Sequence, residues 1–117
     1  MRIDRINEFL LQSKSEYRKF RRTKNEVFLA QAGEKVWVVT QQIIEGIYGR
    51  PIHNHDGYRF AINNLRINKL TELYVSAEPL HTYFYEGHMS TFTVESHLKK
   101  CYALIDILKR KYSGYLI

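Results

Sequence analysis

The chain has 117 residues with a formal net charge of +6, and 44% of its residues are apolar and 14% aromatic. These values exclude a disordered chain, and the length allows one hydrophobic core but not two, so we expect a single domain over residues 1–117. No run approaches the roughly 20 apolar residues that cross a bilayer, the start lacks an apolar signal core, and the lone Cys101 excludes a disulfide network, so the simplest location is the cytoplasm, away from membranes.

Apolar residues recur three and four positions apart along most of the chain, which is the spacing of one face of an α-helix. The first segment carries such a stripe from Ile3 to Phe20, with charged residues on the opposite face. A second helix is predicted from about Asn25 to Ile47, and its two adjacent apolar stripes place it at the centre of a bundle. Gly33 inside this helix costs about 1 kcal/mol relative to alanine, so we interpret it as a point where a neighbouring helix approaches closely.

A loop is predicted next, in the segment YGRPIHNHDG. Gly49 suits the end of a helix, Pro51 cannot continue one, and Asn54 or Asp56 can cap the following helix. A shorter helix is then expected from Tyr58.

Two more helical patterns complete the chain. One contains Leu70 to Phe84, and Pro79 within it predicts a kink or a fresh start near Glu78, because proline removes a backbone hydrogen bond. The other runs from about Val94 to Tyr112. Since no alternation of period two is long enough for a sheet, we expect an all-α fold, an up-and-down bundle of four to five helices.

Basic residues are concentrated between Lys14 and Lys24, a segment that contains six basic residues and one acidic residue. Such a patch attracts phosphates at long range, which favours RNA or an acidic partner protein. An ordinary solvated helix face explains the same residues, and both interpretations remain open. The candidate nucleic-acid-binding residues are Lys14, Arg18, Lys19, Arg21, Arg22 and Lys24.

Two runs carry a family resemblance. In QAGEKVWVVTQQIIEGIYGRPIHNHDGY the matching residues are Gln31, Ala32, Glu34, Lys35, Gly49, His55 and Asp56, and in AEPLHTYFYEG they are Ala77, Leu80, His81, Phe84, Tyr85 and Glu86. The first run resembles the central helix and following loop of the HEPN superfamily. The second is similar to a pattern of its archaeal PaREP branch, which also carries a tryptophan at the position of Trp37.

The resemblance covers the chain from Glu26 to Tyr112 and implies a HEPN-like bundle of about five helices that pairs two-fold with itself or with a partner. HEPN proteins include RNases, toxins paired with small nucleotidyltransferase antitoxins, and binding modules without demonstrated chemistry. The fold alone therefore does not decide the function.

Arg50 and His55 have the spacing of the Arg-x(4–6)-His motif of catalytic HEPN members. The resemblance implies that the histidine handles a proton or orients the 2′-hydroxyl while the arginine stabilises charge on the phosphate. That motif normally follows the third main helix, where this chain reads TYFYEGHMS without an arginine. The competing interpretation is that His55 and Asp56 bond to backbone groups at the start of the next helix.

His53 and His55 could be two ligands of a metal site, but the spacing of the other residues suggests no third ligand. We therefore expect neither a bound metal ion nor another cofactor.

A polar cluster is predicted between two of the helices. Its candidate residues are Glu34, Lys35, Trp37, His81, Tyr85 and Glu86. His81 and Tyr85 lie one turn apart on one face, and Trp37 and Tyr85 offer stacking surfaces for a base. The alternatives are a structural hydrogen-bond network or a polar dimer seam.

Three functions are open at this point. We favour a binding module that engages RNA, a nucleotide or a nucleotidyltransferase-like partner protein as a homodimer. The alternatives are a metal-independent RNase or toxin that uses Arg50 and His55, and a structural subunit of a larger assembly.

Overall fold

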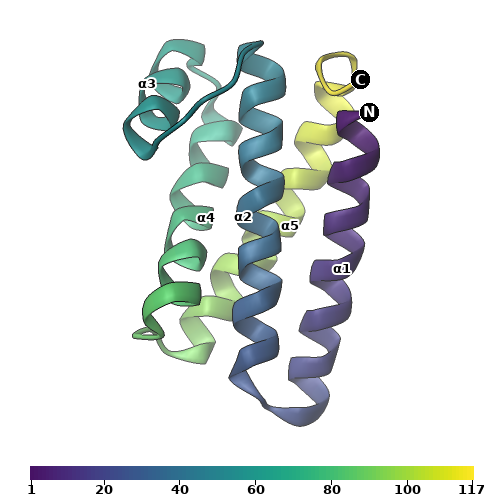
Figure 1. The fold of residues 1–117 in the computed structure, drawn as a ribbon, viewed down its shortest axis with the longest axis vertical. Helices are drawn as coiled ribbons and strands as arrows, with labels where there is room; N and C mark the ends of the chain where they lie inside the picture. The colour runs from purple at the N-terminus through teal and green to yellow at the C-terminus, as the bar shows by residue number, and fades with distance from the viewer.

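The computed structural model describes residues 1–117 as an all-α bundle of five helices (Figure 1), which confirms the predicted fold class. The elements are α1 (Arg2–Thr23), α2 (Glu26–Tyr48), α3 (His55–Leu65), α4 (Asn68–Glu86), α5 (Thr91–Lys111) and the short 3-10 helix η1 (Ser113–Tyr115). The long helices α1, α2, α4 and α5 alternate in direction, and the shorter α3 lies in the connection between α2 and α4. None of the helices combines the length and low polarity that a bilayer span requires.

Local capping chemistry sets the helix boundaries. The side chain of Asn25 accepts a hydrogen bond from the backbone of Val27 at the start of α2, and Gly49 ends that helix in the left-handed conformation. The loop after Gly49 was predicted, but α3 begins at His55, earlier than the predicted Tyr58. Asn54 explains this difference, because its side chain accepts from the backbone N–H of Gly57 at 2.7 Å.

Helix α4 continues through Pro79, so the predicted fresh start near Glu78 is wrong. The proline removes the hydrogen bond to the carbonyl of Val75, four residues earlier. Val75 is 61% exposed, so the carbonyl that loses its donor belongs to a residue on the outer side of α4 and not to one in the core. The helix therefore tolerates the proline without a break.

Helix α2 is the centre of the bundle, as predicted, because it contacts α1, α3, α4 and α5. A single cluster of 28 buried residues fills the interior, and it includes Cys101. Burial raises the pKa of the Cys101 thiol to about 12, so this cysteine is an unreactive core residue. The largest fully buried side chains are Ile6, Leu29, Ile43, Ile44, Leu70, Leu73, Leu80, Leu98, Ile105, Leu108 and Leu116.

The contact between α2 and α4 depends on Gly33. A Cβ at this position would lie 3.2 Å from the Cβ of Leu80, which confirms the predicted close approach of a neighbouring helix. Because Gly33 has no side chain, Leu80 packs directly on the backbone of α2. The neighbouring residues of the two helices, Glu34 and His81, are thereby brought within contact distance.

We expect Gly33→Leu to lower the free energy of unfolding by about 1–3 kcal/mol, because overpacking at Leu80 outweighs the better helix propensity of leucine. Urea unfolding followed by far-UV circular dichroism measures the change. Gly114→Leu is the control, since no atom lies within 4 Å of a Cβ built there. An unchanged unfolding midpoint in Gly33→Leu would contradict this packing argument.

Candidate binding cleft

A cleft of about 230 Å³ opens where α2, α4 and the segment before α3 meet. Its lining residues are Glu34, Trp37 and Gln41 of α2, His81 of α4, and Ile52, His53, Asn54, His55 and Tyr58 of the loop and α3. The loop runs from the end of α2 back to the start of α3 (Figure 1). Glu45 holds this path, because its carboxylate accepts from the backbone N–H of Ile52 at 2.9 Å.

Trp37 forms the base of the cleft and is only 2% exposed. Its ring centroid lies 5.0 Å from that of His81 and 5.5 Å from that of His55, with interplanar angles of 26° and 15°. The two histidine centroids are 5.6 Å apart, so the three rings form a nearly equilateral triangle. Tyr85 extends this aromatic surface outward, because its ring meets that of His81 edge-on at 4.9 Å and is 70% exposed.

Glu34 orients His81. The two carboxylate oxygens lie 2.9 and 3.2 Å from the Nδ1 of His81, which assigns the Nδ1 proton to this bond. Burial raises the pKa of the Glu34 carboxyl, while the hydrogen bond and charge of His81 act in the opposite direction. The pair therefore joins α2 to α4 through a half-buried carboxylate.

A second carboxylate, that of Glu78, lies 3.4 Å from the Nδ1 of His55. The same group accepts from the Tyr74 hydroxyl at 2.5 Å and from the Nη2 of Arg59 at 3.1 Å. Burial alone would raise the pKa of Glu78. The net effect is a lowered pKa, because the carboxylate accepts hydrogen bonds from Tyr74, Arg59 and His55 and is attracted by the positive charge of Arg59. His55 is thus held against Trp37 by an ionised carboxylate of α4.

In both His55 and His81 the Nδ1 atom therefore contacts a carboxylate, and the Nε2 atom forms no hydrogen bond. Both imidazole rings line the cleft, and their Nε2 atoms have no partner within the chain. Imidazole exchanges protons near neutral pH, so this arrangement can bind polar edges of a planar ligand or move protons. No group of three or more potential metal ligands is present in the molecule.

The structure brings together four of the six residues of the predicted polar cluster, namely Glu34, Trp37, His81 and Tyr85. Lys35 does not join them, because its Nζ lies 3.7 Å from Glu16 of α1. Glu86 is exposed at the end of α4 without a side-chain contact. Consecutive helix residues point about 100° apart, so Lys35 cannot share the direction of Glu34, nor Glu86 that of Tyr85.

Arg50 lies outside the cleft that His55 lines. Its guanidinium donates to the hydroxyl of Tyr48 at 2.9 Å and lies 4.8 Å above the same ring. The alternative interpretation, in which His55 and Asp56 bond to backbone groups, is also not what the structure shows. Asn54 has that role, His55 contacts Glu78, and Asp56 lies 3.8 Å from Arg59.

Most of the basic residues of α1 face away from the cleft. Lys14, Arg18, Arg21 and Arg22 follow one exposed side of the helix. This side lies next to α5, since Lys14 is 5.5 Å above the ring of Tyr102 and shares a hollow with Lys109. Lys19 and Lys24 instead lie over the rings of Phe28 and Phe20.

Sequence reasoning missed Glu78 as a site residue. One signal was available, because Glu78 precedes His81 by three residues and so shares a face of α4 with it. Its contact with His55 depends on the path of the loop, which no local pattern predicts.

Comparisons with family models, with curated proteins and with solved structures gave no match for this chain. The resemblance to the HEPN superfamily therefore stays a prediction from the sequence.

The lowered pKa of Glu78 gives a pH-dependent prediction. A carboxyl with a depressed pKa stabilises the fold above its ordinary pKa of 4.5, and this stabilisation is lost as the pH falls through the folded-state pKa. We expect Glu78→Gln to lower the free energy of unfolding by about 1–2 kcal/mol at neutral pH, because three donors lose their charged acceptor. The difference from the unmodified chain should shrink below pH 4.5.

Urea unfolding over a pH series measures this difference. Glu86→Gln is the matched control, since Glu86 is exposed on the same helix and should show no effect at any pH. A loss in Glu78→Gln that stays constant down to acidic pH would contradict the assignment.

Proposed function

We propose that the chain is a HEPN-like binding module whose cleft accepts one base of an RNA strand or nucleotide. The observation that carries the proposal is the triangle of Trp37, His55 and His81 in an open cleft. Its volume of about 230 Å³ is below the roughly 300–1,000 Å³ of pockets for whole small molecules, which suits a single planar group.

The chemistry of the lining supports a base rather than an apolar ring. Aromatic faces stack on any base, and the exposed Tyr85 extends the stacking surface. The amide of Gln41 both donates and accepts, as the polar edge of a base requires, and each free Nε2 adds an acceptor when its imidazole is neutral or a donor when it is protonated. The net charge of +6 favours a polyanion over a cationic ligand.

A homodimer and a nucleotidyltransferase-like partner are part of this proposal through the sequence resemblance. Phe60 and Val75, each 61% exposed on α3 and α4, are apolar side chains that a partner protein would cover.

We expect single-stranded RNA to change the fluorescence of Trp37, the only tryptophan of the chain. Tyr85→Ala should weaken binding about 5- to 150-fold, because stacking contributes roughly 1–3 kcal/mol per base. Fluorescence titration gives both dissociation constants. Tyr115→Ala is the control, since Tyr115 is also exposed but lies in η1. If no polynucleotide or nucleotide binds, the proposal is wrong and a structural subunit becomes the better interpretation.

A second candidate function is metal-independent RNA cleavage, and the geometry favours His55 with His81 over the predicted Arg50 with His55. Both imidazoles are oriented by carboxylates and keep Nε2 free, as a base and an acid require. One Nε2 would take the proton of the 2′-hydroxyl as that oxygen attacks phosphorus. The other, protonated, would give its proton to the leaving 5′-oxygen, which leaves a 2′,3′-cyclic phosphate and a 5′-hydroxyl.

Incubation with RNA in the presence of a chelator tests this candidate. If it is correct, His55→Ala and His81→Ala each reduce the cleavage rate by about 100-fold or more, because general acid–base catalysis contributes that much. Arg50→Ala should leave the rate unchanged. Cleavage that depends on Arg50 would favour Arg50 and His55 as the catalytic pair, as the sequence predicted. An absence of cleavage would leave binding as the function.

A further inference from the structure

No lysine or arginine lines the cleft itself, so the cleft offers no cation for the backbone of a bound strand. Arg59 is paired with Glu78, and Arg50 lies outside the cleft over the ring of Tyr48. The basic side of α1 that contains Lys14 lies next to α5. A polynucleotide with a base in the cleft needs cationic groups elsewhere nearby, because phosphate contacts dominate its affinity.

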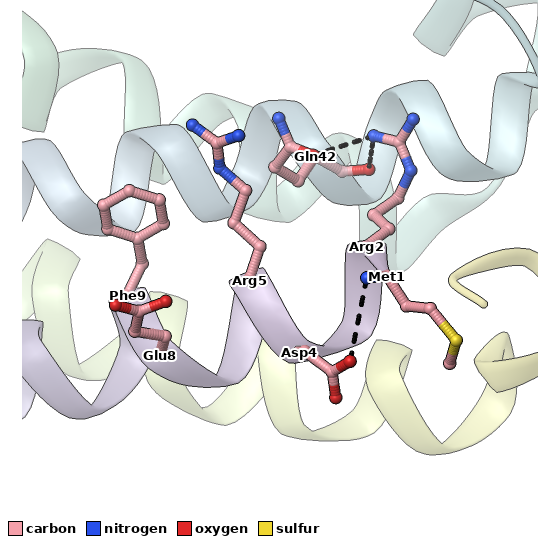
Figure 2. A pocket seen from close by; sticks show the side chains of 7 residues that line it. All are labelled: Met1, Arg2, Asp4, Arg5, Glu8, Phe9 and Gln42. Atoms are coloured by element: carbon pink, nitrogen blue, oxygen red, sulfur yellow. Dashed lines mark hydrogen bonds and ion pairs between the residues drawn. The ribbon is translucent and has the colours of Figure 1, made fainter.

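A hollow of about 700 Å³ lies between α1 and α2, and Arg2, Arg5, Phe9 and Gln42 are among its lining residues (Figure 2). Gln42 directly follows Gln41, which lines the cleft. The hollow and the cleft therefore lie at the same level of α2, on faces of the helix about 100° apart.

Arg2 is fixed against α2 at the hollow. Its stem crosses α2 at Gly46, where a Cβ would lie 3.0 Å from its Cδ. Its Nη1 donates to the carbonyl and to the side-chain oxygen of Gln42 at 3.1 and 2.9 Å, while the other terminal nitrogen points away from Gln42 (Figure 2). Burial raises the pKa of Tyr58, which lines the cleft, to about 12, and the charge of Arg2 acts in the opposite direction.

Arg5 lies one turn further along α1 and is exposed. Its guanidinium is 5.5 Å above the ring of Phe9 and takes part in no hydrogen bond or ion pair. Figure 2 shows the guanidinium groups of Arg2 and Arg5 both projecting toward α2, on either side of Gln42. Two carboxylates also line the hollow: that of Asp4 lies 3.7 Å from the N-terminal ammonium group, and that of Glu8 accepts from Gln12 at 3.4 Å.

We propose that Arg2 and Arg5 bind successive phosphates of a single-stranded polynucleotide that places one base in the cleft between α2 and α4. The planar guanidinium fork matches phosphate oxygens, and residues three apart on a helix are neighbours on its surface. Gln42 lies between the two arginines with its amide nitrogen free for the same strand. This inference rests on the proposed function, because it assumes a base in the cleft.

Two ligands separate the phosphate contacts from the cleft: a nucleoside monophosphate and a single-stranded oligonucleotide of the same base. Arg5→Gln should weaken oligonucleotide binding roughly tenfold and leave monophosphate binding unchanged, since only the longer ligand crosses α2. The slope of log affinity against log salt concentration should fall by about 0.7 for one lost contact, and by about twice that when Arg2→Gln is added. Trp37 fluorescence reports binding of both ligands.

Lys100→Ala is the charge-matched control, because Lys100 is exposed on α5 and should not affect either ligand. Arg5 is exposed, so Arg5→Gln should fold normally, and urea unfolding of both arginine variants verifies this. Equal losses for the two ligands, an unchanged salt slope, or a loss confined to Arg18→Ala would overturn the inference. If Tyr85→Ala weakens binding while Arg5→Gln does not, only this inference fails, whereas absence of binding to the unmodified chain removes the proposed function as well.

Discussion

The close approach of α2 and α4 at Gly33 is the constraint on which the rest of the site depends. Leu80 packs on the α2 backbone, and the adjacent residues Glu34 and His81 come within hydrogen-bond distance as a result. Trp37, one turn further along α2, is then covered by His81. A bundle with a larger side chain at position 33 would separate these helices and open the cleft, because packed interiors transmit even small volume changes.

The two histidine–carboxylate pairs lie in different environments although they share one tryptophan. Glu34 is half-buried and has only His81 as a hydrogen-bonding partner, so burial dominates and its pKa is raised. Glu78 has Tyr74, Arg59 and His55 as donors, and its pKa is lowered. Because the pKa values of the two carboxyls are shifted in opposite directions, the histidines that they contact, His81 and His55, also lie in different electrostatic environments. The cleft is therefore chemically asymmetric, which suits a ligand with one defined orientation.

The charge of the molecule is also divided between surfaces. On α1, Arg2 and Arg5 project toward α2, while Lys14 and the residues that follow it at helical spacing lie toward α5. A net charge of +6 therefore does not identify one binding face. The arginines of the hollow are few, yet they contact Gly46, Gln42 and Phe9, whereas the longer basic run is mostly exposed.

The helices, the central position of α2, the close contact at Gly33 and the proximity of Glu34 to His81 could all be predicted from the sequence, because helical periodicity and capping are local properties. Only the tertiary structure determined the path of the loop between α2 and α3, which is fixed by the hydrogen bond from Ile52 to Glu45. This path stacks His55 on Trp37 and brings Arg50 against Tyr48. The tertiary structure also decided which of two consecutive polar residues, Glu34 or Lys35, faces the cleft. The physical reason is that loop paths and the rotation of a helix about its axis depend on contacts between residues far apart in the chain, which no local spacing records.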